Sequence, residues 1–116
     1  MRYVMLLEAA QPPTPPPAGL MEAIMQLGEE ATAAGALLDN AGLLPSAAGA
    51  RITVTGGALT VTDGPFAETK EMISYALYSV RSKEEAVEWC SRFMKVHRDL
   101  WPEWEGTCRI LQVMEF

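Results

Sequence analysis

Histidine is almost absent from this sequence, and cysteine and basic residues are scarce. The 116 residues include one His, two Cys and nine Lys plus Arg against 15 Asp plus Glu, for a net charge of −6. Structural zinc sites take four closely spaced ligands, and no phosphate-binding glycine-rich loop is present, so we expect neither metal nor cofactor. The few basic residues alternate with acidic ones, which disfavours direct nucleic-acid binding.

Long apolar runs are missing as well. None approaches the ~18 residues of a membrane span, and Glu8 and Pro12 interrupt the first apolar run too early for a signal peptide. We therefore expect a cytoplasmic protein without membrane contact. The length and the apolar fraction of 49% predict one globular domain over residues 1–116. In that compartment Cys90 and Cys108 are expected to be reduced, half-buried thiols.

What is present is a pattern of strands and helices. Apolar runs predict four strands at residues 3–7, 36–38, 73–80 and 108–114. Helical spacing predicts two amphipathic helices, at residues 20–34 and 82–97. Between them, residues 51–55 and 58–62 alternate on either side of Gly56-Gly57, which predicts a β-hairpin. Five prolines between residues 12 and 17 predict an extended connector on the surface.

The order of these elements resembles a ferredoxin-like βαβ-βαβ protomer with an inserted β-hairpin, an α+β fold with both helices on one face of the sheet. The strands are apolar on both sides, so the uncovered face of the sheet is expected to be apolar too. This motivates a homodimer hypothesis in which two sheets pack face to face.

The stretch from residue 63 to residue 71 is the most distinctive in the chain. Gly64 and Pro65 predict a turn at the end of the hairpin, where Asp63 can accept backbone N–H groups. Phe66 is expected to anchor this loop in the core. Three charged residues follow, which are Glu68, Lys70 and Glu71. They are typical of a structural ion network and equally of a site where carboxylates do acid/base work and Lys70 holds an anion.

Residues 60–71, with the sequence TVTDGPFAETKE, resemble the signature of the DGPF-domain, YCII-related family. The resemblance extends over almost the whole chain and includes residues 34–38, 42–46, 83–89 and 97–106. It implies a dimeric α/β-barrel of ferredoxin-like protomers, mostly without assigned biochemistry. Some members occur beside or fused to extracytoplasmic-function sigma factors. Distant relatives include a dehydrochlorinase that uses a His/Asp pair, but no histidine follows the first strand here.

Two departures from the family pattern affect the predicted site. Many relatives have His where this chain has Leu44, and many have Gly where it has Ser74, just before Tyr75. His97 is therefore the only imidazole available. At the end of a helix it suits a packing or cationic capping role as well as a catalytic one. Trp89, Trp101 and Trp104 could line a pocket or pin the turn after the helix to the core.

Three functional hypotheses follow. The first is a homodimer that binds a small molecule near the DGPF loop through Asp63, Gly64, Pro65, Phe66, Lys70 and Tyr75. The second is a non-catalytic dimeric interaction module associated with a transcription regulator. The third is a lyase- or hydrolase-type enzyme with carboxylate acid/base chemistry. Its candidate catalytic residues are Asp63, Glu68, Lys70, Glu71 and His97.

Overall fold

The computed structural model describes residues 1–116 and has two helices and six strands. In chain order they are β1 (Arg2–Ala10), α1 (Leu20–Ala33), β2 (Leu37–Gly42), the short 3-10 helix η1 (Ser46–Ala48), β3 (Ala50–Thr55), β4 (Ala58–Asp63), β5 (Lys70–Ser79), α2 (Lys83–Leu100) and β6 (Thr107–Gln112). Both helices and the hairpin lie where the sequence predicts them. The α+β class and the ferredoxin-like plan are confirmed.

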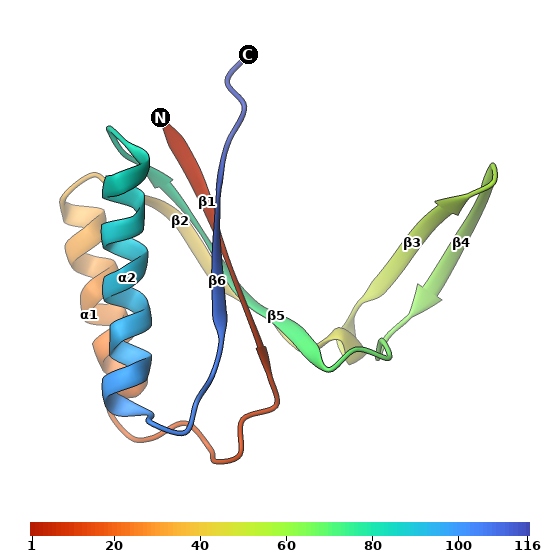
Figure 1. Ribbon diagram of the computed structural model, residues 1–116, viewed down its shortest axis with the longest axis horizontal. Helices are drawn as coiled ribbons and strands as arrows, with labels where there is room; N and C mark the ends of the chain where they lie inside the picture. The colour runs from red at the N-terminus through yellow and green to blue at the C-terminus, as the bar shows by residue number, and fades with distance from the viewer.

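The main sheet has the strand order β2-β5-β1-β6, and every neighbouring pair is antiparallel. Helices α1 and α2 cover one face of this sheet (Figure 1). Residues at every second position of β1, among them Met5 and Leu7, are buried against the helices together with Ala86 and Cys90 of α2. The alternation of a strand therefore places the core between the sheet and the two helices.

No element of the chain covers the opposite face of the sheet, called here the open face. Val4 and Leu6 of β1 face this side and are half-buried, and they lie opposite Leu77 and Tyr75 of β5. Leu111 of β6 lies opposite Val4 on the other side and is exposed. The middle of the open face is thus apolar, as the strand pattern predicts.

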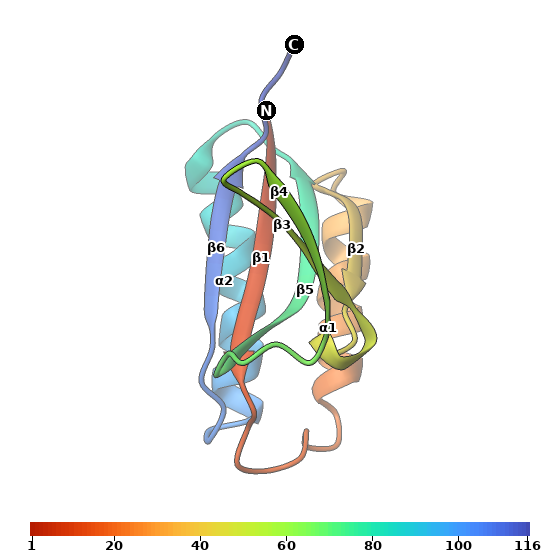
Figure 2. The same cartoon turned by 90° about the vertical axis from the view of Figure 1, so that its right-hand side faces the viewer.

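Strands β3 and β4 form a separate two-stranded sheet, called here the arm (residues 50–63). The arm extends away from the main sheet on the side opposite the helices (Figure 1). Seen from that side, it stands in front of the open face (Figure 2). All residues of both its strands are exposed. The hairpin prediction is confirmed, but its separation from the sheet leaves it without a core of its own.

Some element boundaries differ from the prediction. Strand β5 begins at Lys70, not at residue 73, because its first residues pair with Ala9 and Ala10 beyond a bulge at Ile73 of β5 itself. Helix α2 begins after Ser82, whose Oγ accepts the Glu85 N–H at 3.1 Å, the hydrogen bond of an N-cap. No helix of the chain combines the length and the apolar character that crossing a membrane requires.

Candidate functional site

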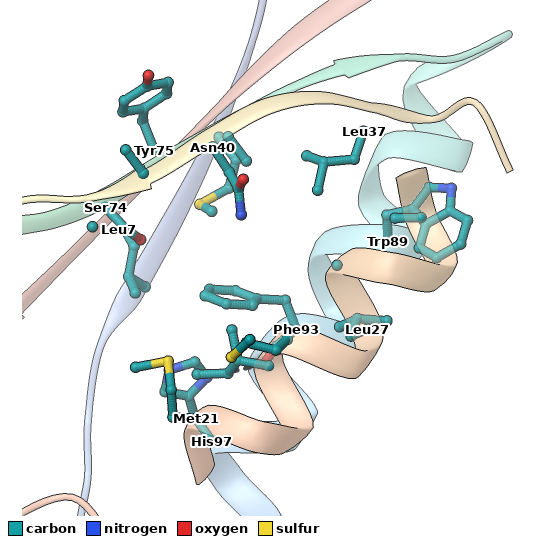
Figure 3. A pocket seen from close by; sticks show the side chains of 18 of the residues that line it. Leu7, Met21, Leu27, Leu37, Asn40, Ser74, Tyr75, Trp89, Phe93 and His97 are labelled. Carbon is teal, nitrogen blue, oxygen red and sulfur yellow. Dashed lines mark hydrogen bonds between the residues drawn. The ribbon is translucent and has the colours of Figure 1, made fainter. Parts of the chain in front are cut away.

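A large cavity of about 800 Å³ lies between α1, α2 and the helix-covered face of the sheet (Figure 3). Hydrophobic residues make up 19 of the 27 that line it, and Glu29 is the only charged side chain among them. Small-molecule sites are typically apolar pockets of roughly 300–1,000 Å³ with a few polar groups. The cavity matches that description in size and chemistry.

His97 is the central polar residue of this cavity. It follows Cys90 and Phe93 on the inward side of α2 and is 5% exposed. Its Nδ1–H donates to the Phe93 carbonyl oxygen at 2.9 Å, which leaves Nε2 without a partner in the chain. Burial lowers the pKa of His97, and the Phe93 hydrogen bond opposes that shift. The imidazole is therefore neutral at neutral pH, with an Nε2 lone pair that can accept a hydrogen bond.

This geometry favours a packing role for His97. Burial disfavours the charged imidazole that a cationic cap of the helix C-terminus requires. The packing prediction is confirmed. The His97 ring lies 4.7 Å from the ring of Phe93 and 4.5 Å from that of Trp104.

Trp104 lies beside His97 at one end of the cavity, and Trp89 lies far from it at the other end (Figure 3). Trp104 lies 6.4 Å from Trp101 in a stacked arrangement, and both line the cavity with Trp89. The Trp101 Nε1–H donates to Thr14 Oγ1 at 2.7 Å, which ties the proline-rich connector to the end of α2. Both predicted uses of the tryptophans hold, because the turn that they pin to the core is also a wall of the cavity.

Ser74 carries the one buried side-chain oxygen or nitrogen in the chain that lacks a hydrogen-bond partner. It lies opposite Leu7 in the β1–β5 ladder, so it faces the helices and lines the cavity. An unpaired buried hydroxyl costs the folded state about 1–3 kcal/mol. Such a group is available to a bound molecule only when the side chain turns toward the cavity, because its oxygen has almost no accessible surface here.

The DGPF motif lies elsewhere, at the base of the arm. The Gly64 N–H donates to the Gly49 carbonyl at 2.9 Å, and the Gly64–Pro65 peptide bond is cis. The Phe66 N–H donates to Ser46 Oγ at 3.1 Å, and Ser46 Oγ donates to Glu71 Oε1 at 2.7 Å. A Cβ on Gly64 would overlap the Ser46 carbonyl. The motif therefore fastens the arm to η1 and β5.

The charged residues of the motif do not converge. Glu68 pairs with Arg51 at 2.6 Å, while Glu71 bonds Ser46. The carboxylate of Asp63 accepts no hydrogen bond, and Lys70 makes no ion pair. The prediction that Phe66 anchors the loop in the core is wrong. Its ring is half-buried under the Arg51 guanidinium, 4.2 Å from the ring centre, because the arm leaves the core before this residue.

Of the predicted site residues, only Tyr75 and His97 line the large cavity. The Tyr75 ring points to the other side of the strand (Figure 3), where its hydroxyl donates to Asp39 Oδ2 at 2.9 Å and this bond raises the pKa of Tyr75. The sequence reasoning missed Phe93 and Ser46. The helical spacing of Phe93 and His97 is a signal that could have indicated the first, whereas nothing local indicates the second.

A second cavity, of about 740 Å³, lies between α2 and β6 and is lined by Cys90 and Cys108 among others. Both thiols are free; Cys90 is buried and Cys108 half-buried. The interaction between the two thiols, and then burial, raise the pKa of Cys90, while the same interaction lowers the pKa of Cys108. No group of three or more His, Cys, Asp or Glu side chains is arranged to hold a metal ion.

Comparison with known proteins identifies a family. The model of the YCII-related domain matches residues 1–116, which is the whole chain. No curated protein matches the sequence.

Proposed function

The chain belongs to the YCII-related domain family, and we propose that it is a homodimer that binds a small, uncharged, largely aromatic molecule. The ligand occupies the large cavity between the helices and the sheet. One observation carries the proposal, namely a cavity of about 800 Å³ built around a neutral imidazole whose Nε2 has no partner in the chain.

The lining of the cavity selects the chemistry of the ligand. Tyr78, Trp89, Phe93, Trp101 and Trp104 provide apolar surface and aromatic rings that can stack on a planar molecule. The lining contains no lysine or arginine, so an anionic group would be desolvated without compensation. A hydroxyl or N–H donor on the ligand finds its acceptor in Nε2 of His97. Lys70, predicted to hold an anion, lies outside this cavity.

Three probes with one ring system test this chemistry. Naphthalene has no polar group, 2-naphthol has a neutral hydrogen-bond donor and 2-naphthoate has an anionic carboxylate. Binding is followed by fluorescence of the tryptophans that line the cavity. We expect 2-naphthol to bind about 5–10-fold more tightly than naphthalene, since one hydrogen bond contributes about 1 kcal/mol, and 2-naphthoate to bind most weakly.

Two substitutions assign that binding to the cavity. His97→Phe retains an aromatic ring but removes the acceptor, so the preference for 2-naphthol over naphthalene should disappear. Tyr75→Phe is the control, because the hydroxyl that it removes lies on the side of β5 that faces away from the cavity and bonds Asp39 (Figure 3). Equal affinities for the three probes, or an unchanged 2-naphthol preference in His97→Phe, would contradict the proposal.

The homodimer is proposed on the open face of the sheet. Val4, Leu6 and Leu77 form an apolar centre that no element of the chain covers. Two such faces packed together would exclude water from both. Leu77→Glu places a charge in that centre and should yield a monomer in sedimentation equilibrium that still binds 2-naphthol. Wild-type protein that stays monomeric at submillimolar concentration would refute the dimer.

The carboxylate-based enzyme is the less supported alternative. Acid/base catalysis by paired carboxylates needs two of them in one site, so that one pKa rises. Glu68 and Glu71 instead bond separate partners, Arg51 and Ser46, at the base of the arm. The interaction-module alternative has one observation in its favour, which is the exposed arm.

A further inference from the structure

We propose that the arm (residues 50–63) is a clasp whose apolar face is covered by a second copy of this chain. Each protomer of the dimer extends its arm onto the other. The inference rests on the homodimer of the proposed function and adds to it the surface that holds the two copies together. It also gives the DGPF motif a role, because the motif forms the base on which the arm stands.

The arm has two chemically different faces. Ile52 lies opposite Val61 and Val54 opposite Leu59, so these four side chains share one face. Their exposed fractions are 66%, 61%, 70% and 68%. The other face carries Thr53 opposite Thr60 and Arg51 opposite Thr62. A hairpin that presents its only apolar face to water is marginally stable, so this face requires a cover.

Hydrogen bonds and an ion pair fix the base of the arm. Gly64 binds Gly49 across the two strands, and Ser46 joins Phe66 to Glu71. The Arg51–Glu68 ion pair and the Arg51–Phe66 contact lie over these bonds. Because both ends of the arm are fastened to β5 and η1, its direction relative to the main sheet is set before any partner arrives. Because this direction is already fixed in the free protomer, ordering the arm adds less to the entropic cost of binding.

The position of the arm indicates what covers it. It stands on the same side of the sheet as the open face (Figures 1 and 2), so a molecule that packs on the open face lies within the angle between the sheet and the arm. The proposed occupant of the open face is a second copy. The arm is therefore continuous with that interface, and two-fold symmetry gives each copy the same clasp.

Charge also favours a second copy. Residues 52–62 contain no charged side chain, although the chain carries a net charge of −6. A like-charged copy can approach a neutral surface, whereas a basic protein partner would find nothing acidic on it to recognise. An anionic membrane surface would find no lysine or arginine along the same stretch.

A matched pair of double substitutions tests the clasp. Val54→Gln with Leu59→Gln alters one cross-strand pair on the apolar face, and Thr53→Gln with Thr60→Gln alters the adjacent pair on the polar face. Dimer dissociation constants come from sedimentation equilibrium. We expect the first variant to dimerise about 100-fold more weakly or worse and the control to stay within about threefold of wild type. Hydrogen exchange of the wild-type arm amides should slow as the protein concentration rises.

Other outcomes separate this inference from the proposed function. An unchanged dissociation constant in the apolar-face variant, or arm exchange that is independent of concentration, overturns the clasp and leaves ligand binding in the cavity intact. Cavity probes that fail to bind a wild-type dimer overturn the ligand proposal and leave the clasp intact. Wild-type co-flotation with phosphatidylglycerol vesicles that the apolar-face variant loses, without any change in its dimer, would assign the arm to membranes and overturn the clasp.

Discussion

Replacing Ser74 with alanine should make the protein more stable while making the cavity a poorer binding site. The Ser74 hydroxyl is buried and has no hydrogen-bond partner in the chain, and such a group costs the folded state about 1–3 kcal/mol. Alanine removes that cost but forfeits some packing, because the hydroxyl fills space beside Leu7. We therefore expect the free energy of unfolding to rise by about 1 kcal/mol.

The assay is urea unfolding of Ser74→Ala and wild type without ligand. With a slope of about 2 kcal/mol/M, a gain of 1 kcal/mol moves the midpoint up by roughly 0.5 M. Ser79→Ala is the matched control on the same strand, because Ser79 lies opposite Arg2 on the open face. The urea midpoint of this variant should equal that of wild type. A Ser74→Ala midpoint at or below wild type would refute the reasoning, because the hydroxyl would then have a partner. Probes that bond the hydroxyl should bind Ser74→Ala up to about fivefold more weakly.

Three further predictions concern other parts of the chain. Gly64→Ala should lower the free energy of unfolding by about 1–3 kcal/mol, because its Cβ would overlap the Ser46 carbonyl; Gly42→Ala, with open space at its Cβ, is the control in the same urea assay. Because burial lowers the pKa of His97 in the folded state, the unfolded chain takes up the proton of this residue at a higher pH, near 6.5, than the folded chain does. Stability should therefore decrease with falling pH, and His97→Gln should flatten that slope between about pH 7.5 and pH 5.5. Iodoacetamide should modify Cys108 before Cys90, because Cys108 is less buried and its pKa is lowered, whereas that of Cys90 is raised; peptide mapping that finds Cys90 labelled first would contradict this.

The elements with a strong local period were predictable from the sequence. Helix α2 has its N-cap at Ser82 and its inward residues at helical spacing, and the Gly56-Gly57 turn defines the hairpin. The start of β5 was not predictable, because Lys70 enters the sheet through pairing with Ala10 of a distant strand. Pairing across a sheet depends on the partner strand as much as on local apolarity.

The candidate site was harder to predict for a related reason. The position of His97 on the inward side of its helix was readable, but the cavity depends on how far α1 and α2 stand from the sheet. That spacing arises from the combined bulk of side chains on four elements, which no local pattern encodes. The motif shows the opposite case. Its charges suggested a site, yet they bond to residues 17 and 25 positions away, Arg51 and Ser46, and fasten a hairpin.

The free energy gained by covering the arm can be compared with the cost of association, and the comparison shows why the DGPF motif must hold the arm in place. The four apolar side chains of the arm are 61–70% exposed, and full burial of an aliphatic side chain contributes about 1.5–3 kcal/mol. Covering one arm would therefore contribute roughly 4–8 kcal/mol, and two arms in a symmetric dimer about twice that. Association itself costs an estimated 4–15 kcal/mol, so the arms offset that cost and leave the open sheet faces to supply the net affinity. This holds only if each arm points at its partner beforehand, which is the geometry that Gly64, Ser46 and Glu71 maintain at its base.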